Sequence, residues 1–419
     1  MENVKNILLR QVTIVDPSSS HHLKKRDVQI QNGKIIRIAS SIKGNDIPTL
    51  HQSDSYLTPA FVDLQTRLGE PGNEIAETFE SACNAAQKGG YGALLAYPSH
   101  SPATTQAAQI SYIQQNARKG VRLLPAGCIS EDMNGLQLAE MYEMHQAGAF
   151  AFTDDKKNIS ITLLARALEY SKTFNGLIIV FPMEPQLNPG GLMHEGKTST
   201  LMGTKGISSV SESMRIQRDL EILKYTGGRL HFSNISCAAS VDLIRKAKRQ
   251  KLSVTCSISA HQLSYLDEDL INFPANLKVL PPFRTEHDRQ SLIEGINDDT
   301  IDCIVSDHTP VIIEDKAVEF EYAHFGISSL MTAFQSALTA TEGDIEISQL
   351  VKKFNTDPAH LIGHTLCSIE ESSSPAMTLF TLSQNTTFSK QNWKSKSFNS
   401  PFIGETLRGA ILHTFLPKP

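Results

Sequence analysis

Short apolar runs alternate with amphipathic stretches through the middle of this chain. The runs have the length and composition of buried strands, and apolar positions recur with a helical period between several of them. The predicted strands lie at 92–97, 121–125, 148–155, 176–181, 229–233, 252–256 and 300–307, and the predicted helices lie near 103–118, 160–173, 238–250 and 328–341. This repeated order predicts an α/β fold with a parallel sheet, most simply a (β/α)8 barrel, with an open doubly wound sheet as the alternative.

Both ends of the chain have a different pattern, typical of paired β-strands. Within 7–38, apolar and polar positions alternate on either side of Asn32-Gly33, and this dipeptide is a strong signal for a hairpin turn. Two more strand candidates, 377–382 and 409–415, lie near the C-terminus. We therefore expect β structure at both ends and strand–helix units between them.

The composition is that of an ordinary globular protein, long enough for one large barrel or two medium domains. The chain has 419 residues, of which 40% are hydrophobic and 20% charged, and its formal net charge is -5. This mild charge predicts no binding to nucleic acid or to an anionic membrane. The start lacks the apolar core of a signal peptide, and the six cysteines form no Cys-x-x-Cys pair. We expect a cytoplasmic protein with reduced thiols.

The segment 57–72 carries the most specific signal in the chain. It reads Leu-Thr-Pro-Ala-Phe-Val-Asp-Leu-Gln-Thr-Arg-Leu-Gly-Glu-Pro-Gly. It resembles the first barrel strand of dihydroorotases, in the amidohydrolase superfamily, where the stretch reads Pro-Gly-Phe-Val-Asp-x-His-x-His-Leu-Arg-Glu-Pro-Gly. Further segments similar to that family follow in order at 85–92, 148–155, 191–196, 281–289, 306–310, 325–327 and 395–404. The resemblance implies a (β/α)8 barrel over 57–365 and a small β-sandwich domain built from 1–56 and 366–419.

In dihydroorotases, histidines and carboxylates at the ends of barrel strands hold zinc, which activates water and polarises the amide carbonyl of the ring. By resemblance, the metal positions of this chain are Gln65, Arg67, Asp154, Phe181, Asn234 and Asp307. Between the two neighbouring carboxylates we prefer Asp154 over Asp155. An amide is a poor zinc ligand, and a guanidinium has no free lone pair with which to ligate. We therefore expect no zinc and no other cofactor.

The family positions that grip the substrate carboxylate have changed as well. They correspond here to Gly69, Ser99 and Val311. Loss of metal ligands alone would leave room for a different metal arrangement. Loss of both sets argues against turnover of dihydroorotate, and leaves Asp307 as a vestigial acid/base position.

Arg67 has a predicted role of its own. We expect its charge to replace the metal by pairing with Asp154 or Asp307, because buried carboxylates need a partner. The alternative is that Arg67 turns out to solvent. Asp307 and His308 could also form a dyad for another reaction, and His100, His194, His231 and His308 could form an unrelated metal site. We favour structural roles for these histidines, and a loop-capping role remains open for Asp154 and Asp155.

The leading hypothesis is a non-catalytic dihydroorotase homologue of pyrimidine biosynthesis. The resemblance implies a structural or regulatory partnership with aspartate transcarbamoylase, the preceding enzyme of that pathway, and we also expect a homo-oligomer. The alternative is an amidohydrolase of cyclic amides with altered one-metal or metal-free chemistry. A working dihydroorotase with an unusual site is the third hypothesis.

Overall fold

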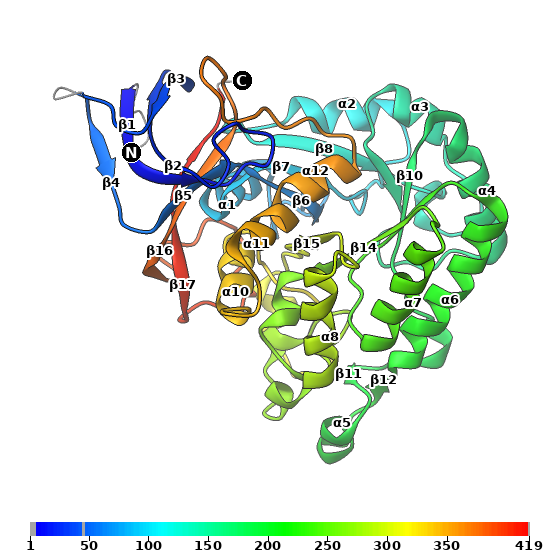
Figure 1. Ribbon diagram of the computed structural model, residues 1–419. Coiled ribbons are helices and arrows are strands. Elements are labelled where there is room, and N and C mark those ends of the chain that lie inside the picture. Colours follow the sequence, from blue (N-terminus) through cyan, green and yellow to red (C-terminus); the bar gives the residue numbers. More distant parts are fainter. Residues whose placement is uncertain (1–5, 44–46, 418–419) are drawn as a thin grey trace.

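Eight parallel strands form the centre of the molecule (Figure 1). The computed structural model describes residues 6–43 and 47–417, so the parts of the expected terminal domain at 1–5, 44–46 and 418–419 lie outside the described residues. Neighbouring strands follow one another in chain order, from the first to the last. They are β6 (Phe61–Thr66), β7 (Tyr91–Ala96), β8 (Arg122–Gly127), β9 (Ala151–Thr153), β10 (Leu177–Val180), β13 (Arg229–Phe232), β14 (Val254–Ser259) and β15 (Cys303–Val305).

The first and last strands meet, so the sheet is a barrel. Thr66 at the end of β6 forms a parallel bridge with His308, just beyond β15. The backbone N–H of Arg67 donates to the carbonyl of His308 at 3.0 Å. The prediction of a (β/α)8 barrel is confirmed, and the open-sheet alternative is wrong because these bonds join its two edges.

A buried carboxylate strengthens this seam between β6 and β15. Asp63 accepts hydrogen bonds from the backbone N–H and the hydroxyl of Ser306, both at 2.7 Å. Burial raises the pKa of Asp63 to about 6, although these hydrogen bonds oppose that shift. The seam therefore depends on side chains as well as on backbone pairing.

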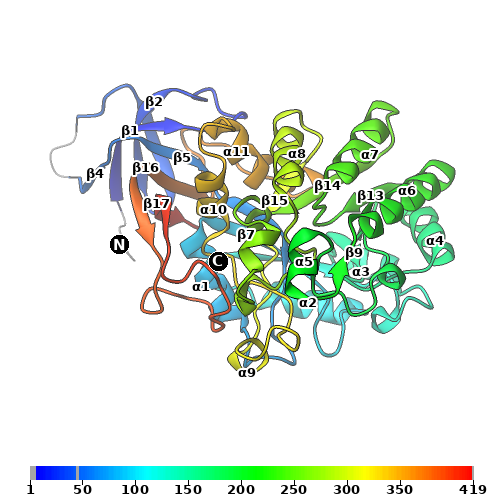
Figure 2. The same cartoon turned by 90° about the horizontal axis from the view of Figure 1, so that it is seen from below.

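Helices cover the outside of the barrel (Figures 1 and 2). The first of them shows how the sequence sets its ends, since the side chain of Thr78 caps its N-terminus and Gly90 ends it with a φ of 90°. The outer helices are α1 (Phe79–Gly89), α2 (Ala107–Gln115), α3 (Met141–Gln146), α4 (Ile161–Ser171), α6 (Ser209–Thr226), α7 (Ala238–Arg249), α8 (Glu286–Asn297), α10 (Ala333–Ala340), α11 (Ile347–Phe354) and α12 (Thr356–Leu361). Shorter elements lie in the long loops, namely β11 (Met193–His194), α5 (Lys197–Met202), β12 (Gly206–Ile207) and α9 (Ile313–Lys316).

Strands from both ends of the chain form a second sheet beside the barrel. Its order is β17-β16-β5-β1-β2-β3, with β4 paired to β1. Its strands are β1 (Asn6–Ile14), β2 (Lys25–Gln31), β3 (Lys34–Ala39), β4 (Thr49–His51), β5 (Ser55–Pro59), β16 (Met377–Thr387) and β17 (Thr406–Phe415). The predicted hairpin is present, with positive φ at both Asn32 and Gly33. The expectation of a small β domain built from both ends is confirmed.

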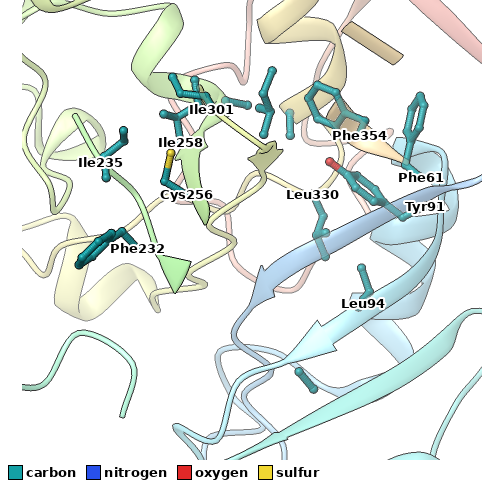
Figure 3. Packing of buried hydrophobic residues seen from close by; sticks show 14 of the residues in the cluster. Phe61, Tyr91, Leu94, Phe232, Ile235, Cys256, Ile258, Ile301, Leu330 and Phe354 are labelled. Atoms are coloured by element: carbon teal, nitrogen blue, oxygen red, sulfur yellow. The ribbon is translucent and has the colours of Figure 1, made fainter. Parts of the chain in front are cut away.

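Aromatic packing joins the barrel to the helices near this sheet. The ring of Phe61 lies 4.6 Å from that of Phe334 and 5.6 Å from that of Phe354, measured between ring centroids. Figure 3 shows Phe61, Tyr91 and Phe354 gathered in one part of the core. These rings are buried, and they fix the first two barrel strands against α10 and α11.

No helix in the described part of the chain is long and apolar enough to cross a bilayer.

Candidate functional site

Charged side chains gather at the carboxyl ends of the barrel strands, where barrel folds place their functional groups. Arg67 follows β6, Asp155 and Lys156 follow β9, and Asp307 follows β15. Each of their side chains is at most 16% exposed. The barrel mouth therefore holds four ionised groups that are largely removed from water.

Arg67 forms a two-pronged ion pair with Asp155. Its Nε donates to Asp155 Oδ2 at 2.5 Å, and its Nη2 donates to the other carboxylate oxygen. Burial by itself would raise the pKa of Asp155, but the charge and hydrogen bonds of Arg67 hold that pKa below its usual value. Arg67 Nη1 also lies 3.9 Å from Asp307 Oδ1. Arg67 thus turns into the barrel mouth, and the alternative of a solvent-facing side chain is wrong.

Of the two expected partners of Arg67, Asp307 lies within 3.9 Å, whereas Asp154 does not pair with it. Asp154 instead accepts hydrogen bonds from the backbone N–H groups of Ile129 and Ser130, at 2.9 and 3.0 Å, and from the Ser130 hydroxyl. The backbone explains the difference, because Asp155 has a φ of 55° and sits in a left-handed turn. This turn directs the two consecutive carboxylates to different partners, so that Asp154 holds the loop after β8 and Asp155 meets Arg67.

Lys156 is a second cation that the sequence reasoning missed. Its ammonium lies 3.0 Å from Asp307 Oδ2, donates to the carbonyl of Leu280, and lies 5.6 Å from the centre of the Phe181 ring. Gln65 Nε2 donates to the other oxygen of Asp307 at 2.8 Å. The available signal was a lysine directly after two aspartates at a predicted strand end.

The four charges balance. Arg67 pairs with Asp155 and Lys156 pairs with Asp307, so two positive charges meet two negative charges. Burial lowers the pKa of Lys156, while the charge of Asp307 opposes that shift. Asp155 and Asp307 each have a cation supplied by the chain itself, which offsets the cost of burying their charge.

The candidate histidines are dispersed. His231 and His308 are each bonded to neighbouring structural groups. His231 lies on β13, and its ring bonds to two residues of the neighbouring β14, Thr255 Oγ1 at 2.9 Å and Ser257 Oγ at 3.0 Å. Burial lowers the pKa of His231 to about 3, so it is neutral. His308 accepts from the N–H of Ser329 at 3.1 Å through Nδ1 and lies 3.2 Å from Glu77 through Nε2. Its ring therefore does not form a dyad with Asp307.

Comparison with known proteins decides the family. A family model described as dihydro-orotase-like matches residues 55–240. The dihydroorotase of Syntrophus aciditrophicus is 35% identical over 416 residues, which cover 98% of this chain and 97% of that protein. The dihydroorotase of Acetivibrio thermocellus is 34% identical, with coverage of 98% and 97%. This chain belongs to the dihydroorotase family.

Solved structures agree with the fold. The L-hydantoinase (dihydropyrimidinase) of Arthrobacter aurescens superposes with a TM-score of 0.83 at 21% identity, covering 99% of this chain and 95% of that one. At that identity the likeness concerns the fold alone. It supports a dihydroorotase-like barrel with an additional sheet from both ends of the chain.

The donors at the positions compared with the dihydroorotase metal site do not fit a catalytic zinc. Gln65 and Asn234 offer amides, and Asn234 Nδ2 is bonded to Ser259 Oγ. Phe181 offers only its ring, and Arg67 occupies its position with a cation. Within residues 6–43 and 47–417, no three or more His, Cys, Asp or Glu side chains are grouped so that they could hold a metal ion. The side chains at these positions therefore do not make the zinc site of a dihydroorotase.

The positions compared with the dihydroorotase substrate clamp have structural roles. Ser99 Oγ donates to Asp155 Oδ2 at 2.8 Å, and the N–H of Val311 donates to Asn399 Oδ1 at 3.1 Å. A Cβ added to Gly69 would lie 2.3 Å from the carbonyl oxygen of Asn73 and 2.4 Å from that of Glu77. The loop after β6 therefore packs directly onto Gly69 and leaves no space for a side chain.

A pocket of about 170 Å³ opens beside the charged cluster. Arg67, Gly69, Ser99 and His100 contribute to its lining, whereas Asp307 and Lys156 do not. Around Asp307 the side chains are closely covered, since Gln65, Asn234 and His261 are at most 1% exposed. Asp307, the expected acid/base position, is thus enclosed.

Replacing Arg67 by methionine should lower the free energy of unfolding by about 3–5 kcal/mol, because it leaves Asp155 buried without its cation. Urea denaturation at pH 7 measures this loss. The double variant Arg67→Met/Asp155→Asn should recover a large part of it, because it also removes the stranded charge. Equal losses in both variants would contradict an electrostatic role for the pair.

The difference in unfolding free energy between the native chain and Arg67→Met should depend on pH. In the native protein the pKa of Asp155 is lowered, so its stabilisation is present above the unfolded pKa of about 4 and is lost as the pH falls through the folded value. In Arg67→Met the pKa of Asp155 should rise, so the deficit should shrink as the pH falls from 7 towards 4.

Adding one methyl group at Gly69 should destabilise the loop after β6. We expect Gly69→Ala to cost about 1–3 kcal/mol through overpacking, measured by thermal unfolding. Gly196→Ala is the matched control, because its φ of -178° is extended and its Cβ would meet His194 only at 3.5 Å. Equal melting temperatures for the two variants would contradict the close packing at Gly69.

Proposed function

We propose that this member of the dihydroorotase family has no dihydroorotase activity and acts as a structural or regulatory partner of aspartate transcarbamoylase. One observation carries the first half of the proposal, namely the balanced cluster of Arg67, Asp155, Lys156 and Asp307 at the barrel mouth. These residues stand where the resemblance predicts metal ligands or lie next to those positions.

The charge balance opposes metal binding. A zinc ion would bring two further positive charges into a largely dry site whose carboxylates already have cationic partners. Binding would require Arg67 and Lys156 to leave, yet Arg67 makes bonds to Asp155 and Thr309, and Lys156 makes bonds to Asp307 and Leu280. The cluster is therefore a substitute for a metal rather than a site that awaits one.

Metal-free hydrolysis is also poorly supported. Asp307 would have to activate water, but its carboxylate is bonded to Gln65 and Lys156, and its side chain is only 4% exposed. The adjacent pocket reaches Arg67 and stops short of Asp307. This geometry disfavours the alternative of an amidohydrolase with altered one-metal or metal-free chemistry.

The second half of the proposal, the partnership, rests on the family sequence and fold that the chain shares with dihydroorotases. Similarity to a dihydroorotase extends over 98% of its length, and the described residues form both the barrel and the second sheet. A family fold that surrounds a filled site is consistent with a function performed by its surface. The partner itself comes from the family resemblance.

Metal content and activity test the catalytic half. We expect protein purified without chelators to hold far less than one zinc per chain, and to hydrolyse dihydroorotate no faster than a blank. The dihydroorotase of Syntrophus aciditrophicus, assayed in parallel, controls for the assay. Stoichiometric zinc together with turnover would contradict the proposal.

Co-assembly tests the partner half. We expect the chain and the aspartate transcarbamoylase of the same organism to sediment as one complex at micromolar concentration, and the transferase to be more active or better assembled in that complex. If the two proteins sediment as separate boundaries over a range of salt concentrations, and the transferase activity is unchanged, this partner is rejected.

A further inference from the structure

Two loops at the barrel mouth carry an unusual surface. One follows β14 and includes residues 266–276, and the other follows β15 and includes residues 312–325 with α9. We call these two segments the acidic cap. Figure 2 shows α9 at the margin of the molecule, away from the second sheet.

The acidic cap concentrates negative charge. Its two segments contain seven carboxylates and one cationic residue, Lys316, which gives them a formal charge of -6. The buried Lys278 lies two residues beyond the first segment and brings the local sum to -5, equal to the charge of the whole chain. Lys316 is buried, and the only ion pair recorded for the cap in the described residues joins Asp315 to His324 at 3.6 Å. Five carboxylates are exposed, those of Glu268, Asp269, Glu314, Glu319 and Glu321.

Large apolar side chains are exposed among these carboxylates. Five of them have exposed fractions between 37% and 70%. They are Ile271, Phe273, Ile313, Val318 and Tyr322. Exposed apolar side chains that are rimmed by polar residues mark candidate sites of protein contact.

The two loops of the acidic cap are held together from inside. The ammonium of Lys278 donates to the carbonyls of Phe320 and Glu321 at 2.7 and 2.8 Å. The ammonium of Lys316 donates to the carbonyls of His324 at 2.7 Å and Lys278 at 3.2 Å. The ring of Phe273 packs against Phe320 with 5.8 Å between centroids. A surface fixed in this way loses little conformational entropy when a partner binds.

We propose that the acidic cap is the docking surface for a protein that presents arginine or lysine side chains around an apolar strip. This inference rests on the proposed role of the chain as a partner protein and adds the place and chemistry of the contact. Negative charge disfavours nucleic acid and anionic membranes as occupants. A symmetric contact with a second copy would oppose one acidic cap to another, which charge repulsion disfavours.

Charge reversal with a matched control tests the inference. Glu314→Lys/Glu319→Lys changes the acidic cap, and Glu169→Lys/Glu221→Lys makes the same charge change on the exposed faces of α4 and α6. The binding probes are the aspartate transcarbamoylase of the same organism and a short leucine–lysine amphipathic helical peptide. With both probes we expect the cap variant to associate about tenfold more slowly at low salt, and the control to stay within about twofold of the native chain.

A third variant separates apolar contact from charge. Ile313→Ser/Tyr322→Ser should weaken binding by raising the dissociation rate while leaving the salt dependence of association unchanged.

The outcomes separate this inference from the proposed function. If the transferase binds the cap variant and the control equally well, the acidic cap is not its docking surface, although the partnership stands. If the transferase does not bind the native chain while the peptide binds through the cap, the named partner fails and the surface chemistry stands. Equal peptide binding by the cap variant and the control would overturn the inference. So would native self-association that charge reversal at the cap abolishes, because the occupant would then be a second copy.

Discussion

Two buried carboxylates at the barrel mouth each require a positive charge within bonding distance, and the rest of the site follows from how that need is met. Arg67 reaches Asp155 from the end of β6, and Lys156 reaches Asp307 from the end of β9. A carboxylate left without its cation would cost several kcal/mol, as truncations of buried pairs do. The cluster therefore constrains the neighbouring side chains, including Gln65, Ser99 and Thr309, which supply its remaining hydrogen bonds.

Further packing makes the arrangement difficult to reverse. Gly69 admits no side chain, because the carbonyls of Asn73 and Glu77 lie where its Cβ would stand. Leu280 accepts a bond from Lys156 and so brings the loop after β14 over the cluster. Returning single residues to the family pattern would break these contacts without restoring a complete site.

Local patterns in the amino-acid sequence predicted much of the fold. Asn32-Gly33 marked its hairpin because both residues adopt the positive φ that the turn requires. Apolar runs located the barrel strands, because parallel strands are buried on both faces. The hydrophobic pattern alone left open whether the sheet closes into a barrel. The order of the dihydroorotase-like segments along the chain favoured the closed barrel.

The partners within the site were harder to predict, because they depend on the local direction of the backbone. The sequence placed two carboxylates at the end of β9, but the left-handed turn at Asp155 decided which of them meets Arg67. Lys156 was missed because its position in the chain does not show that its long side chain crosses to Asp307. The closeness of Asn73 to Gly69 depends on the fold of a whole loop, and no pattern of residue types reports it.

Arg67 also spans the barrel. It belongs to the strand end on one side of the seam, contacts Asp307 on the other side, and grips Asp155 three strands away. Its ion pairs therefore connect strand ends on both sides of the junction where β15 meets β6. A barrel braced by a bound ion can lose that brace to a chelator or to metal scarcity, whereas this brace is part of the polypeptide. Arg67 is a covalent part of the chain, so no chelator can remove the connection it makes between these strand ends.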